Sequence, residues 1–159
     1  MKSIIYQKNG TKGAAEEIIE YLVAYGEREI LLISERECVD VEFYKMNGIN
    51  LKVHILKEGE GLSDALHSEG AFIDESQFMI IFGREIVEID LDNFKSFHNQ
   101  GTKLLSILQR ESRDEKRMLS VICENETLDY LSPSTDFQRT VISKIGESGE
   151  IDIYVYNCM

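Results

Sequence analysis

The sequence predicts an α/β fold with three α/β/α layers, in which helices cover both faces of a mostly parallel, mixed sheet. Short apolar runs alternate with amphipathic helical patterns, which is the arrangement that builds parallel sheets from βα units. Several of these runs are almost unbroken, as is typical of strands that are buried on both faces. The chain has 159 residues, the size of one domain. We therefore expect residues 1–159 to form a single domain.

The spacing of apolar residues defines the elements of the first part of the chain. Apolar residues recur three and four positions apart in the expected helices, and they alternate or run together in the expected strands. The run from Gln77 to Phe82 is the longest unbroken apolar run and should be the central strand. Apolar and polar residues alternate at 51–56, so this strand should lie nearer an edge. The expected strands are 3–6, 29–34, 51–56 and 77–82, and the expected helices lie near 15–23, 35–47, 62–72 and 91–97.

The end of each helix has its own signal. Gly26 is placed to end the first helix, and Asn47-Gly48 should close the second, whose apolar residues are Val39, Phe43, Tyr44 and Met46. Gly70 weakens the third helix. Asp90 can cap the fourth, with Leu91, Phe94 and Phe97 facing inward and Gly101 just past its end.

The last third of the chain should add an antiparallel part to the sheet. A strand is expected at 104–108, followed by a charged loop at 109–116. The apolar runs 118–122 and 127–131 flank four polar residues, a spacing that predicts a hairpin. Residues 137–145 fit either a helix or a strand, and the alternating run 151–156 predicts a closing strand.

Composition argues against several classes of partner. The chain carries 29 acidic and 17 basic residues, a formal net charge of −12. Such a protein repels phosphate backbones and anionic lipid surfaces, so we expect neither a nucleic-acid nor a membrane partner. No apolar run approaches the roughly 20 residues of a membrane span. The three cysteines are widely spaced and form no CxxC pair, which favours reduced thiols and a cytoplasmic protein.

Three loops are candidate ligand sites, because ligands of open parallel sheets bind beyond the carboxyl ends of the strands. The first contains Gly10, Thr11 and Lys12, whose backbone N–H groups and ammonium could hold a phosphate. It lacks the spacing of a P-loop or a GxGxxG motif, so a plain βα turn is the alternative. The second contains Gly61 and Ser63, where a ligand could approach the backbone. A flexible loop that starts a helix is the alternative there.

The third loop, Gly83-Arg84-Glu85, follows the expected central strand. The rigid guanidinium of Arg84 suits a phosphate or a carboxylate. The alternative is a surface ion pair with Glu85 or Glu88. We expect any ligand of this protein to bind at this loop.

Other polar residues have simpler explanations. Asp90 and Asp92 could be metal ligands, but a helix cap and a favourable charge in the first helical turn account for both. The three histidines, His54, His67 and His98, have no nucleophile or metal partner at a telling spacing, and His98 should interact with the end of its helix dipole. The residues therefore predict no catalytic group, no metal ligand and no cofactor.

One segment carries a family resemblance. Its residues are Glu60 to Leu66, Phe78 to Gly83, Ile89 to Leu91, Phe97-His98 and Gly101. This pattern resembles the sugar-phosphate nucleotidyltransferases, the nucleoside-diphosphate-sugar pyrophosphorylase family. In that family a Gly-rich turn opens the helix under the nucleotide base, and an apolar strand then ends in Gly-Asp. Weaker similarity involves Ser3 to Ile5, Gly10 to Lys12, Glu20 to Leu22, Leu128 to Pro133 and Ile153 to Tyr156. The resemblance implies a nucleotide-diphospho-sugar transferase-like fold.

The departures from the family pattern bear on activity. The family's Gly-Asp supplies a carboxylate for the catalytic magnesium, and here that position is Arg84, which is permanently positive. Lys12 replaces the arginine of the signature loop, which looks shortened before Ala14. The lysine of a Glu-Lys-Pro motif is absent at Ser132-Pro133. We also expect the elements that complete the family's sugar site after the strand at 153–156, including a second metal-binding aspartate, to be missing. The resemblance thus implies the fold without its metal-dependent chemistry.

Three functions follow as hypotheses. The first is a catalytically inactive relative that acts as a nucleotide- or sugar-phosphate-binding, regulatory or partner-binding protein. Its candidate ligand residues are Gly10, Thr11, Lys12, Gly61, Ser63, Gly83, Arg84 and Glu85. The second is an active minimal transferase that recruits Mg²⁺ ligands from Glu85, Glu88 or Asp90. The third is a protein-interaction or structural module that shares only the fold, and an apolar patch near residues 137–159 would favour it, with a protein partner or a homo-oligomer.

Overall fold

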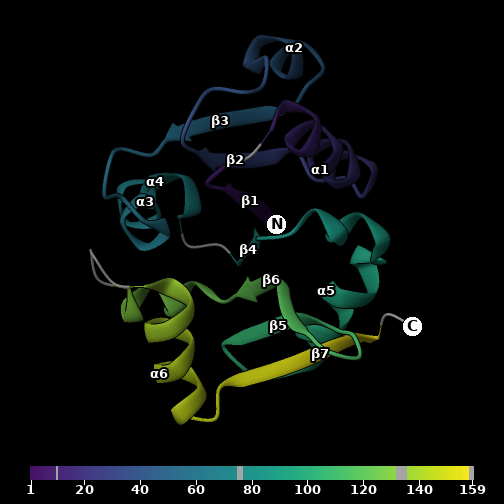
Figure 1. Ribbon diagram of the computed structural model, residues 1–159, viewed down its shortest axis with the longest axis vertical. Coiled ribbons are helices and arrows are strands. Elements are labelled where there is room, and N and C mark those ends of the chain that lie inside the picture. The colour runs from purple at the N-terminus through teal and green to yellow at the C-terminus, as the bar shows by residue number, and fades with distance from the viewer. Residues whose placement is uncertain (10, 75–76, 132–135, 158–159) are drawn as a thin grey trace.

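The computed structural model describes residues 1–9, 11–74, 77–131 and 136–157. These residues build one seven-stranded sheet with helices on both sides (Figure 1). The strands are β1 (Lys2–Gln7), β2 (Glu29–Ser34), β3 (Asn50–Ile55), β4 (Phe78–Ile81), β5 (Leu105–Glu111), β6 (Lys116–Cys123) and β7 (Ile151–Asn157). Their order across the sheet is β3-β2-β1-β4-β6-β5-β7.

The sheet is parallel except at β6. Strand β1 pairs in parallel with β2 and β4, β2 pairs in parallel with β3, and β5 pairs in parallel with β7. Strand β6 is antiparallel to both of its neighbours, β4 and β5. The predicted mostly parallel, mixed sheet is confirmed. The predicted places of two strands are also confirmed, since β4 lies in the middle of the order and β3 lies at an edge.

Two layers of helices cover the sheet. On one face α1, α2 and α5 pack on a core that includes Ile5 and Met79; on the other, α3, α4 and α6 pack on a core that includes Ile4 and Ile80 (Figure 1). Both faces of the central strands are thus buried, which explains their nearly unbroken apolar sequence. The helices are α1 (Lys12–Ala24), α2 (Val41–Met46), α3 (Leu62–Ser68), α4 (Gly70–Ile73), α5 (Leu91–Gln100) and α6 (Ile142–Glu147).

Shorter helical turns connect some of these elements. A 3₁₀ turn, η1 (Arg84–Glu88), follows β4, and a second, η2 (Asn125–Tyr130), follows β6. A π-helical turn, η3 (Phe137–Val141), leads into α6, so the ambiguous segment 137–145 is helical. Within the described residues no helix is both long and apolar enough to cross a bilayer.

The strand order changes direction at β1: the strands before β4 are added on one side of β1, and β4 is added on the other. Strands β1, β2 and β3 follow one another toward one edge, and the chain then returns to place β4 on the other side of β1. The helices that follow β1 and β3 consequently lie on opposite faces of the sheet. The carboxyl ends of β1 and β4, at Gln7 and Ile81, flank this switch point. In an open α/β sheet such a point leaves a crevice suited to a ligand.

The predicted end of α1 at Gly26 and the predicted cap of α5 at Asp90 are confirmed, and the structure adds a cap at the start of α1. Thr11 caps α1, because its Oγ1 accepts a hydrogen bond from the backbone N–H of Ala14 at 3.3 Å. Gly26 follows that helix with φ +86°, a conformation that favours glycine. Asp90 caps α5 through the backbone N–H of Asn93, at 3.3 Å.

The predicted hairpin was wrong in its position. The hairpin is formed by β5 and β6 around residues 112–115, and residues 127–130 belong to the 3₁₀ turn η2. Near the turn, Arg110 pairs with Arg117 and Glu111 pairs with Lys116. The register of the two strands is irregular between Leu108 and Gln109. Charged residues at this largely exposed end make the strands look like a loop in the sequence.

The predicted helix at 35–47 was too long. Helix α2 contains only residues 41–46 and begins at Asp40, whose carboxylate accepts from the backbone N–H of Phe43 at 3.2 Å. A helix this short turns only one side to the core. Tyr44 is buried there, whereas Phe43 and Met46 are exposed instead of facing inward.

Candidate functional site

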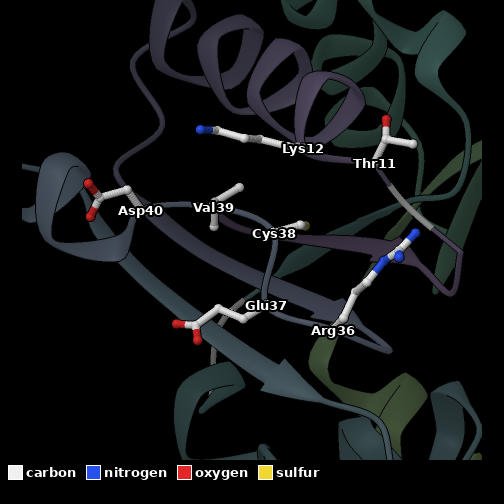
Figure 2. A pocket seen from close by; sticks show the side chains of 7 residues that line it. All are labelled: Thr11, Lys12, Arg36, Glu37, Cys38, Val39 and Asp40. Carbon is white, nitrogen blue, oxygen red and sulfur yellow. The ribbon is translucent and has the colours of Figure 1, made fainter.

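Two loops at the carboxyl ends of the strands line an open cavity of about 540 Å³. It lies between the start of α1 and the loop that connects β2 to α2, and Figure 2 shows Thr11 and Lys12 on one side of it and residues 36–40 on the other. Its lining combines two cationic side chains, two carboxylates and a thiol. The lining residues are Thr11, Lys12, Arg36, Glu37, Cys38, Val39 and Asp40.

The start of α1 gives this cavity a positive wall. No acidic residue lies in the first turn of the helix. The hydroxyl of Thr11 binds the N–H of Ala14 and its carbonyl binds the N–H of Ala15, so Lys12 and Gly13 have no helical partner for their own N–H groups. The helix dipole and two such N–H groups favour an anion here. The ammonium of Lys12 is exposed and lies 3.8 Å from the carboxylate of Glu16.

The candidates Thr11 and Lys12 are therefore brought to one cavity wall. Gly10, which the sequence places beside them, lies outside the described residues. Arg36 and Cys38 were missed, because the β2–α2 loop was expected to be helical. The signal that could have found them is Ser34 at the end of a buried strand, since the next residues must then lie at the carboxyl edge.

A second cavity, of about 480 Å³, lies under the loop that follows β3. The turn 57–60 forms much of its wall, together with the ends of β1 and β2. Its lining residues are Lys8, Glu35, Leu56, Lys57, Glu58, Gly59 and Glu60.

Gly61 and Ser63 lie just beyond this second cavity, at the start of α3. The N–H of Gly61 donates to Oδ2 of Asp64 at 3.0 Å, so this N–H already has a partner within the helix. Ser63 is fully buried, and its Oγ has no hydrogen-bond partner among the described residues. The structure does not bring Ser63 to a cavity wall.

The loop after β4 is built around Gly83. A Cβ at this position would lie 2.8 Å from Oε2 of Glu85 and 3.0 Å from Cδ2 of Leu119, so the bend accommodates only glycine without movement of its neighbours. The carboxylate of Glu85 accepts from Nη1 of Arg117 at 2.8 Å and lies 3.6 Å from Nη1 of Arg110.

Arg84 forms an ion pair, but not with the predicted partners. Its Nε donates to Oε2 of Glu17 at 2.6 Å, and Nη2 lies at the same distance from that oxygen. Glu17 belongs to α1, whereas the sequence suggested Glu85 or Glu88. The side chain of Arg84 is 66% exposed. Arg84 thus connects the loop after β4 to the helix that follows β1.

A smaller cavity, of about 250 Å³, lies at the switch point itself. Tyr6 and Phe82, at the ends of β1 and β4, form an edge-to-face pair with ring centroids 6.3 Å apart, and Phe137 lies 6.1 Å from Phe82. Leu62, Asp136 and Gln138 complete the lining. Burial, aided by Asp136 and Glu35, raises the pKa of Tyr6. The aromatic walls suit a planar ring, and this site was missed because Phe137 comes from a distant segment.

Comparison with known proteins identifies the fold. No protein-family model matches the sequence, and no curated protein matches it. Solved structures do match. A protein from Bacillus anthracis assigned as a glucose-1-phosphate thymidylyltransferase, in complex with a sucrose, has a TM-score of 0.71 and 13% identity over 98% of this chain and 87% of its own. The chain has a nucleotidyltransferase-like fold.

Two further structures support this conclusion. UDP-glucose pyrophosphorylase from Acinetobacter baumannii has a TM-score of 0.70 and 11% identity, over 97% of this chain and 85% of its own. The UTP-bound UGPase from the same organism has a TM-score of 0.69 and 11% identity, over 98% and 86% of the two chains. These identities show the fold alone, because one fold supports many functions.

The sequence suggested that the three histidines are isolated, but in this nucleotidyltransferase-like fold His54 and His98 each have close polar partners. At the opposite edge of the sheet His98 bonds through Nδ1 to Oγ of Ser106 at 2.6 Å and through Nε2 to Oε1 of Glu124 at 2.9 Å. Both His98 and Ser106 are buried, at 3% and 1% exposure, so neither of these two side chains is open to a substrate. On the other side of the molecule His54 bonds to two carboxylates, Glu60 and Glu69.

Proposed function

We propose that the protein binds a nucleotide or a sugar phosphate at the carboxyl edge of its nucleotidyltransferase-like fold, as a binding or regulatory protein without catalytic activity. The cavity at the start of α1 carries this proposal. A molecule with a net charge of −12 needs a locally positive region to attract an anion. Lys12, Arg36 and the amino end of α1 provide such a region around one cavity.

The two carboxylates that line this cavity, Glu37 and Asp40, are not spread evenly around it. Asp40 is engaged as the cap of α2. In Figure 2 Asp40 and Glu37 lie on the side away from Thr11 and Arg36, and the ammonium of Lys12 extends toward the side of Asp40. The geometry therefore supports a ligand whose phosphate lies near Thr11, Arg36 and the backbone N–H of Lys12. The family resemblance puts the nucleotide base over the helix that opens at Gly61, just beyond the cavity under the turn 57–60.

The loop after β4 supports the absence of metal-dependent catalysis. The resemblance places a magnesium-binding carboxylate at position 84, where the guanidinium of Arg84 is held by Glu17. The adjacent Glu85 is bonded to Arg117 and lies close to Arg110, and Asp90 caps α5. Within the described ranges no cluster of His, Cys, Asp or Glu is arranged to hold a metal ion. The residues present at this loop therefore do not fit magnesium.

A thermal-shift panel tests ligand binding. UTP, UDP-glucose and glucose 1-phosphate should each be measured with and without Mg²⁺. Ligand at about 100 times its Kd stabilises a protein by roughly 2.7 kcal/mol, which is a shift of several degrees for a domain of this size. We expect at least one ligand to raise Tm without Mg²⁺. The double variant Lys12→Ala/Arg36→Ala should reduce the shift, whereas Lys45→Ala, an exposed lysine on α2, should not.

Two outcomes would contradict the proposal. A flat panel would leave no support for nucleotide or sugar-phosphate binding. Release of pyrophosphate from UTP and a sugar phosphate with Mg²⁺ would instead support the minimal transferase, and the variant Glu85→Gln/Glu88→Gln would then test its recruited ligands.

Alkylation of Cys38 locates the bound ligand. Cys38 lines the cavity beside Lys12, whereas Cys123 is fully buried and burial raises the pKa of its thiol. In a Cys158→Ser background, iodoacetamide should therefore modify Cys38 first. A ligand in this cavity should slow that reaction. An unchanged rate at saturating ligand would place the binding site elsewhere.

One observation favours a protein-interaction role as a second candidate. Strand β7 is at an edge of the sheet, and its Ile153 and Val155 are 51% and 43% exposed. The predicted apolar patch near 137–159 thus has these two residues on an edge strand, which is a usual place for pairing with another chain. Sedimentation at increasing concentration should reveal self-association that Ile153→Lys abolishes. A monomer at every concentration would argue against the homo-oligomer.

A further inference from the structure

His54, on the edge strand β3, binds a carboxylate through each of its ring nitrogens. Nε2 lies 2.9 Å from Oε1 of Glu60, and Nδ1 lies 2.9 Å from Oε1 of Glu69. An ionised carboxylate only accepts hydrogen bonds, so each nitrogen must carry a hydrogen to bond with it. Both nitrogens carry hydrogen only in the imidazolium form. The complete set of contacts is therefore that of protonated His54.

The surroundings favour this charged form. The side chains of His54, Glu60 and Glu69 are only 14%, 13% and 11% exposed, so water cannot readily replace a lost contact. Lys52, on the same strand, binds the second oxygen of Glu69 at 2.7 Å. Burial alone would lower the pKa of His54, but the hydrogen bonds and charges of Glu69 and Glu60 outweigh burial and raise it. The strand beside it, β2, places the apolar Ile33 opposite His54.

The two carboxylates belong to different parts of the fold. Glu69 lies at the junction of α3 and α4. Glu60 closes the turn 57–60: its Oε1 also accepts from the backbone N–H of Lys57 at 3.1 Å, and its own N–H donates to the Lys57 carbonyl at 3.0 Å. His54 thus connects three elements, namely its own strand, the helix junction and a turn that forms the wall of the second cavity.

We propose that protonation of His54 fixes the turn 57–60 and that loss of this proton releases it, so that ligand binding in the cavity under the turn depends on pH. A neutral ring can donate to only one carboxylate. Whichever carboxylate keeps that bond, the connection between the turn and the α3–α4 junction is broken. A fixed cavity wall costs a ligand less ordering on binding, so affinity should be higher in the protonated state. The effect on affinity rests on the proposed function, whereas the effect on the turn rests on the geometry alone.

NMR of the intact protein without ligand tests the effect on the turn. The His54 ring and the backbone amides of Gly59 and Glu60 should be followed between about pH 5 and 8.5. We expect one common midpoint, above the ordinary value for histidine. The variant Glu60→Gln should uncouple them, because a glutamine amide can donate to the unprotonated ring nitrogen. His67→Gln, which removes an exposed histidine of α3, should leave the coupling unchanged. Turn amides that do not follow His54, or that still follow it in Glu60→Gln, would overturn the proposal.

Calorimetry with UDP-glucose tests the effect on affinity. Its diphosphate has no group that titrates between about pH 6 and 8, so a change of affinity reports on the protein. We expect binding to weaken roughly threefold to tenfold from the lower to the higher pH, the equivalent of one hydrogen bond, and to be insensitive to pH in Glu60→Gln. Equal affinity at both values would overturn the link to binding. If UDP-glucose binds at neither pH, the proposed function fails for this ligand, and the NMR result alone decides the role of His54.

Discussion

Arg84 interacts with a neighbouring helix and not with the acids of its own loop. A long side chain at 66% exposure can reach several carboxylates, and the position of α1 beside η1 determines which one it meets. Local sequence suggests the nearest acids along the chain, whereas packing provides Glu17. The contact places the guanidinium of Arg84, at the end of the central strand, beside a carboxylate of α1.

The Arg84–Glu17 pair should contribute little to stability. Exposed ion pairs are screened by solvent and lose side-chain entropy, and they usually contribute about 0–1 kcal/mol. We expect Arg84→Ala and Glu17→Ala each to lower the free energy of unfolding by less than about 1 kcal/mol in urea titrations. A double-mutant cycle with a coupling above roughly 2 kcal/mol would mean that the pair is a structural element of the loop.

The buried Ser106–His98 pair should matter more. Ser106→Ala removes the partner of a ring nitrogen that has no access to water, which costs about 1–3 kcal/mol. Urea unfolding of Ser106→Ala should show this loss, and Ser112→Ala, an exposed serine in the β5–β6 turn, should be nearly neutral. Equal stability of both variants would show that the buried hydrogen bond is replaced by another contact.

At the scale of single elements, the start of α5 allows two roles of Asp90 to be distinguished, namely helix cap and metal ligand. A capping carboxylate can be replaced by an amide, since asparagine caps helices as well as aspartate does. Asp90→Ala should therefore cost about 1 kcal/mol, and Asp90→Asn should cost almost nothing. Chemical denaturation measures both. A large loss in Asp90→Asn would indicate that the charge itself is needed.

Most elements could be predicted because their apolar spacing is long and regular. Helix α1 and strands β1, β2 and β4 were found with their inward residues, since burial on one or both faces leaves a clear periodic pattern. The β5–β6 hairpin was misplaced because its exposed end carries Gln109 to Glu111 and Lys116 to Arg117. A polar ladder at the end of a hairpin has the composition of a loop.

The sequence could predict the location of the candidate site but not the residues that come together there. The rule that ligands bind at the carboxyl ends of strands directs attention to Thr11 and Lys12, which line a cavity of about 540 Å³. It cannot reveal that Arg36 and Cys38 face them, that Ser63 is buried, or that His54 joins Glu60 to Glu69. These contacts join residues from separate elements, so they follow from packing and not from local sequence.

At the scale of the whole molecule, the cluster around His54 predicts how stability depends on pH. The pKa of His54 is higher in the folded protein than in the unfolded chain, so its contribution is complete below about pH 6.5 and is lost as pH rises through the folded pKa. Partial burial opposes the charged form of Glu60 and Glu69, but their hydrogen bonds prevail and lower both pKa values. Their contribution is present above about pH 4.5 and is lost as pH falls through the lowered values.

The contribution of the His54–Glu60–Glu69 cluster to the free energy of unfolding should therefore be greatest in mildly acidic solution. Urea midpoints at a series of pH values should show that His54→Gln loses the decrease on the alkaline side, by about 1.4 kcal/mol for each unit of pKa difference. His67→Gln should retain the decrease. Identical alkaline limbs in His54→Gln and the wild type would contradict this assignment.

The position of β4 also affects the route by which the sheet can assemble. Its pairing joins Ser3 to Met79, and that of β7 joins Leu105 to Ile151, so each pair closes a long loop. The antiparallel hairpin joins Leu108 to Ser120 across a short turn. Closing a long loop costs more chain entropy before any contact repays it, and folding slows as such distant contacts dominate. We infer that the hairpin is the first part of the sheet to form, and that the cavity at the switch point, between Tyr6 and Phe82, exists only after the slow joining of β1 to β4.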